Sequence, residues 1–150
     1  MGYSITVSNE ISLIVLDNVP SELCFMVSVL ESLAQNNVNI DMISQAPSQG
    51  VTSRLSFSIP DCELESAFKV ISDYREVHKD LKFAVSSGNY KISVNGEDMR
   101  TKPGVAASVF SAVAKVQGDI RLITTAETEI SILLSQPDSE SVVAAINSAI

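Results

Sequence analysis

The sequence predicts an α+β fold in which a strand–helix–strand–strand–helix–strand unit occurs twice within 150 residues. The order of apolar patterns predicts the unit, because runs with strand spacing and runs with helical spacing follow one another in this order. The second half then repeats the first: Ser28-Val29 recurs as Ser108-Val109, and Ile40 as Ile120, at one offset of 80 residues. A βαββαβ unit of this kind is ferredoxin-like, with two helices over one face of an antiparallel sheet.

The elements of the first copy follow from its apolar spacing. Residues 11–16 form a short β-branched run of strand length, and the apolar residues from Leu23 to Ala34, Val27 among them, recur at helical spacing. Further along, Leu55 and Phe57 alternate with serines, which is typical of a half-buried strand. The first copy is therefore expected to contain strands at 11–16, 38–45, 52–59 and 81–85, with helices at 23–34 and from Pro60-Asp61 onward.

The second copy is shorter than the first. It is expected to contain helices at 105–116 and 139–150 and strands at 90–95, 120–125 and 129–134, without a last strand. Past the hairpin loop its offset falls to 77, because Pro60-Asp61 reappears as Pro137-Asp138. An unfilled sheet edge is a pairing hazard, so we expect the N-terminal segment 3–7 to complete the second sheet. The predicted domains are 8–86, and 87–150 with strand 3–7, with Ser86–Asn89 as the linker-like stretch.

Charge and composition exclude several classes of function. The chain has 18 acidic residues against 10 Lys plus Arg, a net charge of −8, which argues against binding to nucleic acid or to anionic membranes. It has no apolar run near the roughly 18 residues that span a bilayer, and its start has no signal-peptide pattern. Cys24 and Cys62 are expected to be reduced, semi-buried thiols, and together these features predict a cytoplasmic protein.

Residues able to carry catalysis are scarce. The one histidine, His78, follows a polar helix turn and is expected to be a solvated surface residue. One histidine and two distant cysteines do not provide the ligands of a zinc site, and no glycine-rich phosphate loop occurs. Ferredoxin-like units also include small hydrolases that use an arginine and an asparagine, but the arginines of this chain are dispersed, at Arg54, Arg75, Arg100 and Arg121. We therefore predict no catalytic residue, no metal and no cofactor.

The informative dipeptide is Pro103-Gly104, directly before an apolar helix. Proline pre-sets the turn, glycine lets the backbone approach a neighbour closely, and the free N–H groups of the helix start face outward. Those N–H groups suit a carboxylate such as that of a free amino acid. An ordinary helix-initiating turn is the alternative interpretation of the same residues.

Three segments match the pattern of a known family. Asn39–Gln45 (NIDMISQ) is similar to NIDMIxQ, Met99–Ala107 (MRTKPGVAA) to GM[KR]SHPGVAA, and Ile123–Ile132 (ITTAETEISI) to ISTSEIKISV. In this order, and over nearly the whole chain, they resemble the tandem ACT region that regulates aspartokinase. The resemblance implies two ACT domains in tandem. The family's kinase domain has no counterpart in these residues, so an isolated regulatory portion or a regulatory subunit is implied.

The resemblance also implies a ligand and a dimer. In that family ACT pairs dimerise, and the feedback effectors lysine and threonine bind between one domain's loop and its partner's strand. The implied partners are thus a free amino acid, a second copy of the chain, and a kinase domain or catalytic subunit. The carried-over effector positions are Asp17, Asn39, Asp41 and Gln45 in the first copy, and Met99, Pro103, Gly104, Val105, Ala106, Asp119, Ile120 and Glu127 in the second.

Roles for these positions follow from their chemistry. Asp41 or Asp17 would pair with the effector's ammonium group, and Gln45 would hydrogen-bond its side chain. The backbone from Gly104 to Ala106 would take its carboxylate.

The chain departs from the family pattern at several positions. An ungapped alignment of the two copies puts Leu23-Cys24 at the Pro-Gly positions, so the first loop lacks that glycine. Arg121 stands at a usually acidic position, Asp119 replaces an asparagine, and Ala126 stands where the family often has serine. A salt bridge from Arg121 to Asp41 or Glu127 across the ACT pair is one interpretation. The alternative to an effector-binding module is a structural dimerisation module that has lost its effector.

Overall fold

The computed structural model of the chain describes residues 2–47, 50–135 and 139–150. They divide into two compact units, Glu10–Ser87 (the first unit) and the residues up to Asn9 together with Gly88–Ile150 (the second unit). Strands β1 and β4 run through both units. In chain order the elements are β1 (Ser4–Pro20), α1 (Leu23–Gln35), β2 (Ile43–Pro47), β3 (Thr52–Pro60), η1 (Asp61–Glu63), α2 (Leu64–Val77), β4 (Lys82–Asn95), η2 (Glu97–Arg100), α3 (Val105–Lys115), β5 (Asp119–Thr125), β6 (Glu129–Ser135) and α4 (Ser139–Ala149).

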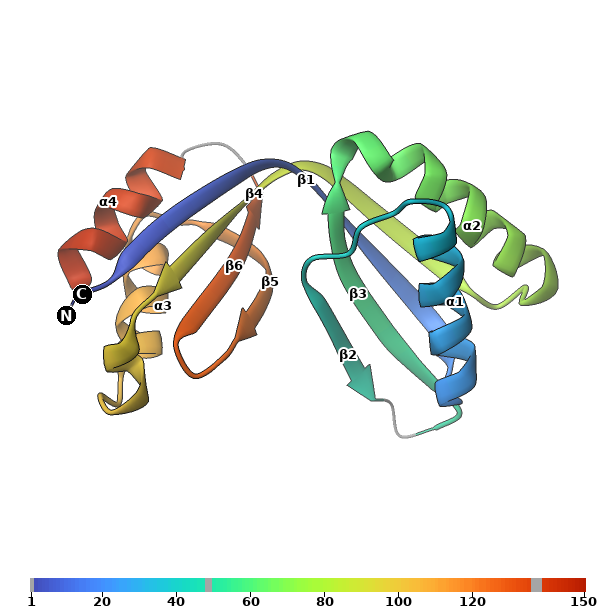
Figure 1. The fold of residues 1–150 in the computed structure, drawn as a ribbon, viewed down its shortest axis with the longest axis horizontal. Coiled ribbons are helices and arrows are strands. Elements are labelled where there is room, and N and C mark those ends of the chain that lie inside the picture. Colours follow the sequence, from blue (N-terminus) through green and yellow to red (C-terminus); the bar gives the residue numbers. More distant parts are fainter. Residues whose placement is uncertain (1, 48–49, 136–138) are drawn as a thin grey trace. The chain divides into compact units, whose positions relative to one another are not determined.

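The first unit combines strands β1 to β4 with helices α1 and α2 (Figure 1), and β3 pairs antiparallel with both β1 and β2. Its strand order is β2-β3-β1-β4, the order of a ferredoxin-like unit. Ile14 lies opposite Phe57 in the β1–β3 register, and both side chains are fully buried. Helices α1 and α2 pack on the same core through Leu33 and Ile71. Burial of these side chains is what holds the ends of the strands, and hence the connecting loops, in place.

The second unit has the same plan, with β1 supplying a strand from the other end of the chain. Its strand order is β1-β4-β6-β5, and α3 and α4 pack on a core that includes Ile92, Val109 and Ile132. Tyr3 packs against this core from the N-terminal segment. A Cβ added at Gly96 would lie 2.3 Å from Cδ1 of Tyr3, so glycine is required there for close approach.

Both repeats therefore have the predicted α+β, ferredoxin-like fold, but some details of the sequence-based prediction were wrong. Leu23 and Val27 belong to the predicted apolar spacing of the first helix, yet 67% of Leu23 and 39% of Val27 are exposed. The buried residues of α1 are Leu33, which belongs to that spacing, and Val29, which does not. A single-sequence pattern does not fix which part of a broad apolar face meets the sheet.

Two strand boundaries also differ from the prediction. The strand expected at 38–45 begins at Ile43, because the chain first closes α1 through Asn37 at φ 60° and a Val38 N–H to Leu33 carbonyl bond. The stretch Ser86–Asn89, expected as a linker, lies inside β4. Gly88 carries the strand through this stretch at φ 69°, a conformation that favours glycine.

Several expectations concern the surface and the chain's undescribed residues. Cys24 in α1 and Cys62 in η1 are both exposed rather than semi-buried. Within the described ranges, no helix is long and apolar enough to cross a membrane. Ser48-Gln49 of the expected hairpin loop and the repeated Pro137-Asp138 lie outside the described residues.

Candidate functional site

The Pro103-Gly104 turn is built by the short η2 helix and the start of α3. Backbone N–H groups of Thr101 and Lys102 both donate to the Asp98 carbonyl, at 3.2 and 3.0 Å, which closes the turn before Pro103. Gly104 is the N-cap of α3 and has φ 89°, the left-handed region. A Cβ there would meet nothing within 4 Å, so the backbone angle, rather than crowding within the chain, favours glycine.

A cavity of about 300 Å³ opens at this turn. No side chain caps the N-terminus of α3, whose first N–H groups have no partner within the helix. The lining brings together five of the predicted positions, Met99 and Pro103 to Ala106, with residues that were not predicted. The complete lining is Met99, Lys102–Ala106, Thr125, Ala126 and Ile130. Uncapped N–H groups beside an apolar wall can bind a small carboxylate that carries an apolar or amphipathic tail.

Lys102 adds a positive charge to the rim of this cavity. Its Nζ lies 3.0 Å from Oδ2 of Asp98, one helical turn earlier in the chain. The hydrogen bond from Lys102, followed by its charge, lowers the pKa of Asp98, and the same contact raises the pKa of Lys102. A bound carboxylate would therefore compete with Asp98 for the ammonium group.

Three predicted positions of the second unit do not line the cavity. The Asp119 carboxylate accepts a hydrogen bond from Ser135 and lies 3.3 Å from Nε of Arg121. Glu127 lies 2.7 Å from a guanidinium nitrogen of Arg100. Ile120 packs against the core of the unit. Within the chain, Arg121 therefore pairs with Asp119, and Glu127 pairs with Arg100. A pairing of Arg121 with Asp41 or Glu127 across the ACT pair stays a prediction.

The predicted positions of the first unit lie apart from that unit's own cavity. Asp17 forms a 2.6 Å ion pair with Arg54, and Gln45 lies exposed on β2 opposite Leu55. Asn39 and Asp41 precede β2, where the Asn39 N–H donates to a Glu63 carboxylate oxygen and the Asp41 N–H to the Ser58 carbonyl.

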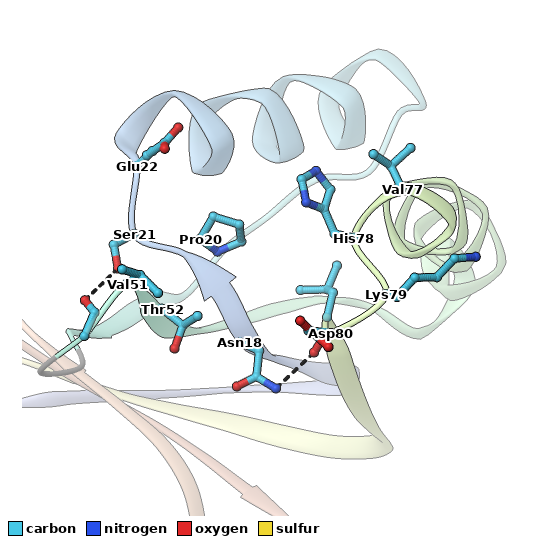
Figure 2. A pocket seen from close by; sticks show the side chains of 12 residues that line it. Asn18, Pro20, Ser21, Glu22, Val51, Thr52, Val77, His78, Lys79 and Asp80 are labelled. Atoms are coloured by element: carbon cyan, nitrogen blue, oxygen red, sulfur yellow. Dashed lines mark hydrogen bonds between the residues drawn. The ribbon is translucent and has the colours of Figure 1, made fainter.

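The larger cavity, of about 690 Å³, lies in the first unit and contains none of the predicted site residues (Figure 2). Its walls are Asn18 and Pro20–Glu22, Gly50–Thr52, and Val77–Leu81. His78 is half-buried there, with its ring edge-to-face against Phe25 at 4.6 Å, so the expectation of a solvated histidine was wrong. Three segments that are far apart in the sequence form this cavity. Of its lining residues, His78 alone drew notice in the sequence, and the sequence does not show that the other segments lie beside it.

The comparison with known proteins agrees with the two-unit architecture. A family model described as the ACT domain matches residues 17–74 and 92–150, one match for each unit. The chain belongs to the ACT-domain family. Each unit is one ACT repeat, which explains why the two units have the same strand order. The helix after the Pro103-Gly104 turn is the first helix of the second repeat. Among the described residues, no cluster of His, Cys, Asp and Glu could hold a metal ion.

Relatives of these ACT repeats are aspartokinases. The aspartokinase of Bacillus sp. (strain MGA3) is 28% identical over 141 residues, which cover 94% of this chain and 34% of that protein. Aspartate kinase of Pseudomonas putida is 32% identical over 127 residues, with 81% and 29% covered. This chain thus spans about a third of the length of the curated relatives it matches, and it corresponds to their regulatory region.

A solved structure shows the same tandem fold as a separate polypeptide. The regulatory subunit of aspartate kinase from Thermus thermophilus has a TM-score of 0.84 at 22% identity, with 97% of this chain and 96% of that chain covered. At that identity the likeness establishes the fold of the ACT repeats.

Proposed function

We propose that the chain is a regulatory ACT module that binds a free amino acid at the start of α3 and transmits its occupancy through an interface between two copies. The observation that carries the proposal is the cavity at the left-handed Gly104, where the uncapped α3 N-terminus meets an apolar wall. Lysine and threonine are the effectors we test first. A solved structure of Escherichia coli aspartokinase III contains lysine and aspartate, and it has a TM-score of 0.69 to this chain.

In the proposed binding mode, the carboxylate and the side chain of the amino acid contact different parts of the cavity. Its carboxylate would accept hydrogen bonds from the N–H groups of Val105 and Ala106, with Lys102 nearby. Its apolar atoms would lie against Met99 and Ile130. The positions outside this cavity would complete the site from a second copy of the chain, namely Asp17, Asn39, Asp41, Gln45, Asp119, Ile120 and Glu127.

A regulatory module acts on a catalytic partner. The module would control ATP-dependent phosphorylation of aspartate in a kinase domain or a separate catalytic subunit, and would sense the cytoplasmic pool of the amino acid. Such coupling requires two states of the dimer that differ in their affinity for the effector.

A thermal-shift screen tests the binding claim. The twenty amino acids are added singly and as a lysine–threonine mixture. A ligand at about 100 times its Kd should add roughly 2.7 kcal/mol of stability, which is a shift of several degrees. Gly104→Ala should abolish the shift, because alanine strains the left-handed turn at the cavity.

The matched control for this variant is Gly88→Ala. Gly88 also has a positive φ and open space around its Cβ position, but it lies in β4 and not in the cavity. Its variant should carry a similar backbone strain and keep the ligand shift. Absence of any shift with all twenty amino acids would refute the effector-binding function.

A structural dimerisation module is the second candidate. It is favoured by the intrachain ion pairs that occupy Asp119 and Glu127, two carboxylates carried over from the family as effector contacts. Analytical ultracentrifugation distinguishes the candidates. A stable dimer whose association does not respond to any amino acid would establish the structural function, whereas a ligand-dependent dissociation constant would exclude it.

A further inference from the structure

A cavity of about 340 Å³ lies along the last turns of α2 and contains none of the positions predicted to bind an effector. It is lined by Ser72, Arg75, Glu76 and Lys79. The first three residues belong to α2, and Lys79 belongs to the turn that follows the helix. All four side chains are polar or charged and all four residues are exposed, so a water-soluble ligand can reach them.

The guanidinium group of Arg75 is held in place by two contacts. Its Nε donates a hydrogen bond to the Leu81 carbonyl at 3.1 Å, and its Cζ lies 5.1 Å from the centre of the Phe83 ring. The Phe83 ring packs edge-to-face against Phe68, with the ring centroids 5.5 Å apart. Because the guanidinium group is already positioned, it loses little conformational entropy when it binds a ligand.

Most of the hydrogen-bonding capacity in this cavity is unused. Since Nε of Arg75 is occupied, its other four N–H donors lie on the two terminal nitrogens, in a planar fork that matches two oxygens of an anion. Among the residues that the structure describes, no hydrogen bond or ion pair engages this fork, the Lys79 ammonium group or the Ser72 hydroxyl. A bound anion would therefore displace no protein partner from these groups.

Arg75 differs in this respect from the other arginines of the chain. Those are Arg54, Arg100 and Arg121, and each forms an ion pair with a carboxylate. Arg75 shares its cavity with Glu76, yet within the described ranges no ion pair joins Glu76 to a cation. In a chain of net charge −8, an arginine and a lysine that are both unpaired at one cavity form a local site of positive charge.

The donors and charges of the cavity fit a phosphate monoester better than a carboxylate. Such an ester has three terminal oxygens and a charge of about −1.5 to −2 at pH 7, whereas a carboxylate has two oxygens and a single charge. Two cationic groups match the larger charge, and the Arg75 fork, the Lys79 ammonium group and the Ser72 hydroxyl match three oxygens. Glu76 repels phosphate, so the best ligand also has a cationic donor for this carboxylate.

We propose that this cavity binds a small phosphate monoester whose carbon chain carries an amino group. The phosphate would lie between the Arg75 fork and the Lys79 ammonium group and accept a hydrogen bond from the Ser72 hydroxyl. The amino group would donate to Glu76. This cavity shares no residue with the one at Gly104, and the proposal does not depend on binding there.

The test is a titration of the full ¹⁵N-labelled chain with 2-aminoethyl phosphate at constant ionic strength, followed by amide chemical shifts. Shifts should concentrate in residues 72–79 and at the Nε–H signal of Arg75, and they should persist in Gly104→Ala. The analogue 2-aminoethyl sulfate, with one negative charge on its sulfate group, should bind about tenfold more weakly. Ethyl phosphate and inorganic phosphate, which have no amino group, should bind about three- to fivefold more weakly.

Variants of the lining test the role of each group. Arg75→Lys keeps the charge but removes the fork, and Lys79→Gln removes a charge, so each should raise the Kd for 2-aminoethyl phosphate about tenfold. Lys69→Gln is the matched control and should leave the Kd unchanged, because Lys69 is an exposed lysine of α2 outside the cavity. Glu76→Gln should remove the advantage of 2-aminoethyl phosphate over ethyl phosphate.

Thermal unfolding separates a loss of binding from a loss of folding. Arg75→Lys removes the contacts to Leu81 and Phe83 and is expected to lower the melting temperature. Lys79→Gln changes an exposed side chain without an ion pair in the described part of the chain, so its melting temperature should equal that of the wild type. Its Kd therefore tests the site whatever the stability of Arg75→Lys.

Three results would each overturn the proposal. The first is the absence of shifts in residues 72–79 with 2-aminoethyl phosphate. The second is the same Kd in Lys79→Gln as in Lys69→Gln, which would mean that the ester binds elsewhere. The third is equal binding of inorganic phosphate and 2-aminoethyl phosphate, which would make the ligand a free phosphate ion. None of these results changes the response to amino acids expected at Gly104, so the function proposed above is tested separately.

Discussion

The two ACT repeats share their core register but differ at the start of the first helix. Val29 and Val109 occupy equivalent buried positions at the offset of 80 residues. At the helix start, Leu23 begins α1, whereas the equivalent Pro103 precedes α3, which begins two residues later in the repeat. Gly104 caps α3 in the left-handed region, and the α1 N-cap, Glu22, is extended. Packing fixes the helices against the sheet, while the residues just before them decide what the loop can bind.

The two cavities reflect this difference. In the second unit the cavity lies at the helix start and is lined mainly by backbone and apolar side chains. In the first unit it extends from the loop before α1 to the connection between α2 and β4, with charged side chains in its wall. Loops change faster than the elements they join, so one fold can hold two chemically different cavities.

The largest expected effect tests whether the two units have separate cores. Phe57 in the first unit and Ile132 in the second are both fully buried. Replacing either with alanine leaves a cavity, and we expect the free energy of unfolding to fall by about 3–5 kcal/mol for Phe57→Ala and about 2–5 kcal/mol for Ile132→Ala. Urea unfolding measures the loss, and hydrogen exchange locates it.

The pattern of hydrogen exchange shows whether the cores of the two units unfold separately. Phe57→Ala should reduce protection most in residues 10–87, and Ile132→Ala in 88–150, so each variant serves as the control for the other. Uniform loss of protection across both units in both variants would show that the cores unfold as one.

The fold could be predicted because its signals are local and periodic. The alternation around Phe57 and the helical spacing around Leu33 each occupy a few consecutive residues, and the repeat doubles the evidence. The turn at Pro103-Gly104 could be predicted because its signal is also local. Asp119 and Glu127 are predicted effector positions, and within the chain Arg121 and Arg100 pair with them; the sequence carries no signal of such ion pairs. The larger cavity was missed because tertiary structure alone brings its three segments together.

A smaller effect is expected when the turn of the second repeat is built into the first. Leu23→Pro combined with Cys24→Gly should move the start of α1 to Phe25. Leu23 is mostly exposed and Cys24 is exposed, so little burial is lost, and stability should change by about 1 kcal/mol or less. Carbon-13 α shifts report the helix start, and thermal unfolding reports the stability.

The reciprocal variant is the control for this exchange. Pro103→Leu with Gly104→Cys puts a side chain at φ 89° unless α3 extends, and strain of this kind costs about 1–2 kcal/mol. If α1 still begins at Leu23 in the first variant, the helix start is set by packing rather than by these two residues, and the contrast between the repeats has another cause.

The smallest effect concerns the charge at each cavity. The hydrogen bond and charge of Lys102 lower the pKa of Asp98 from 3.8, so the pair's contribution to stability is complete above that value and is lost as the pH falls through the lower, folded pKa. The pKa of Lys102 is raised, so its contribution is complete below 10.5 and is lost as the pH rises through the folded value.

Lys102→Met should therefore move the NMR titration midpoint of the Asp98 carboxyl up toward 3.8, and 1 M salt should move the wild-type midpoint in the same direction. Lys79→Met, at the other cavity, is the control that should leave Asp98 unchanged, because Lys79 has no ion pair within the described residues. An Asp98 midpoint that is the same with and without Lys102 would mean that this lysine is as free as Lys79. The two cavities would then differ in shape and lining alone, and a carboxylate ligand would meet an available ammonium group at both.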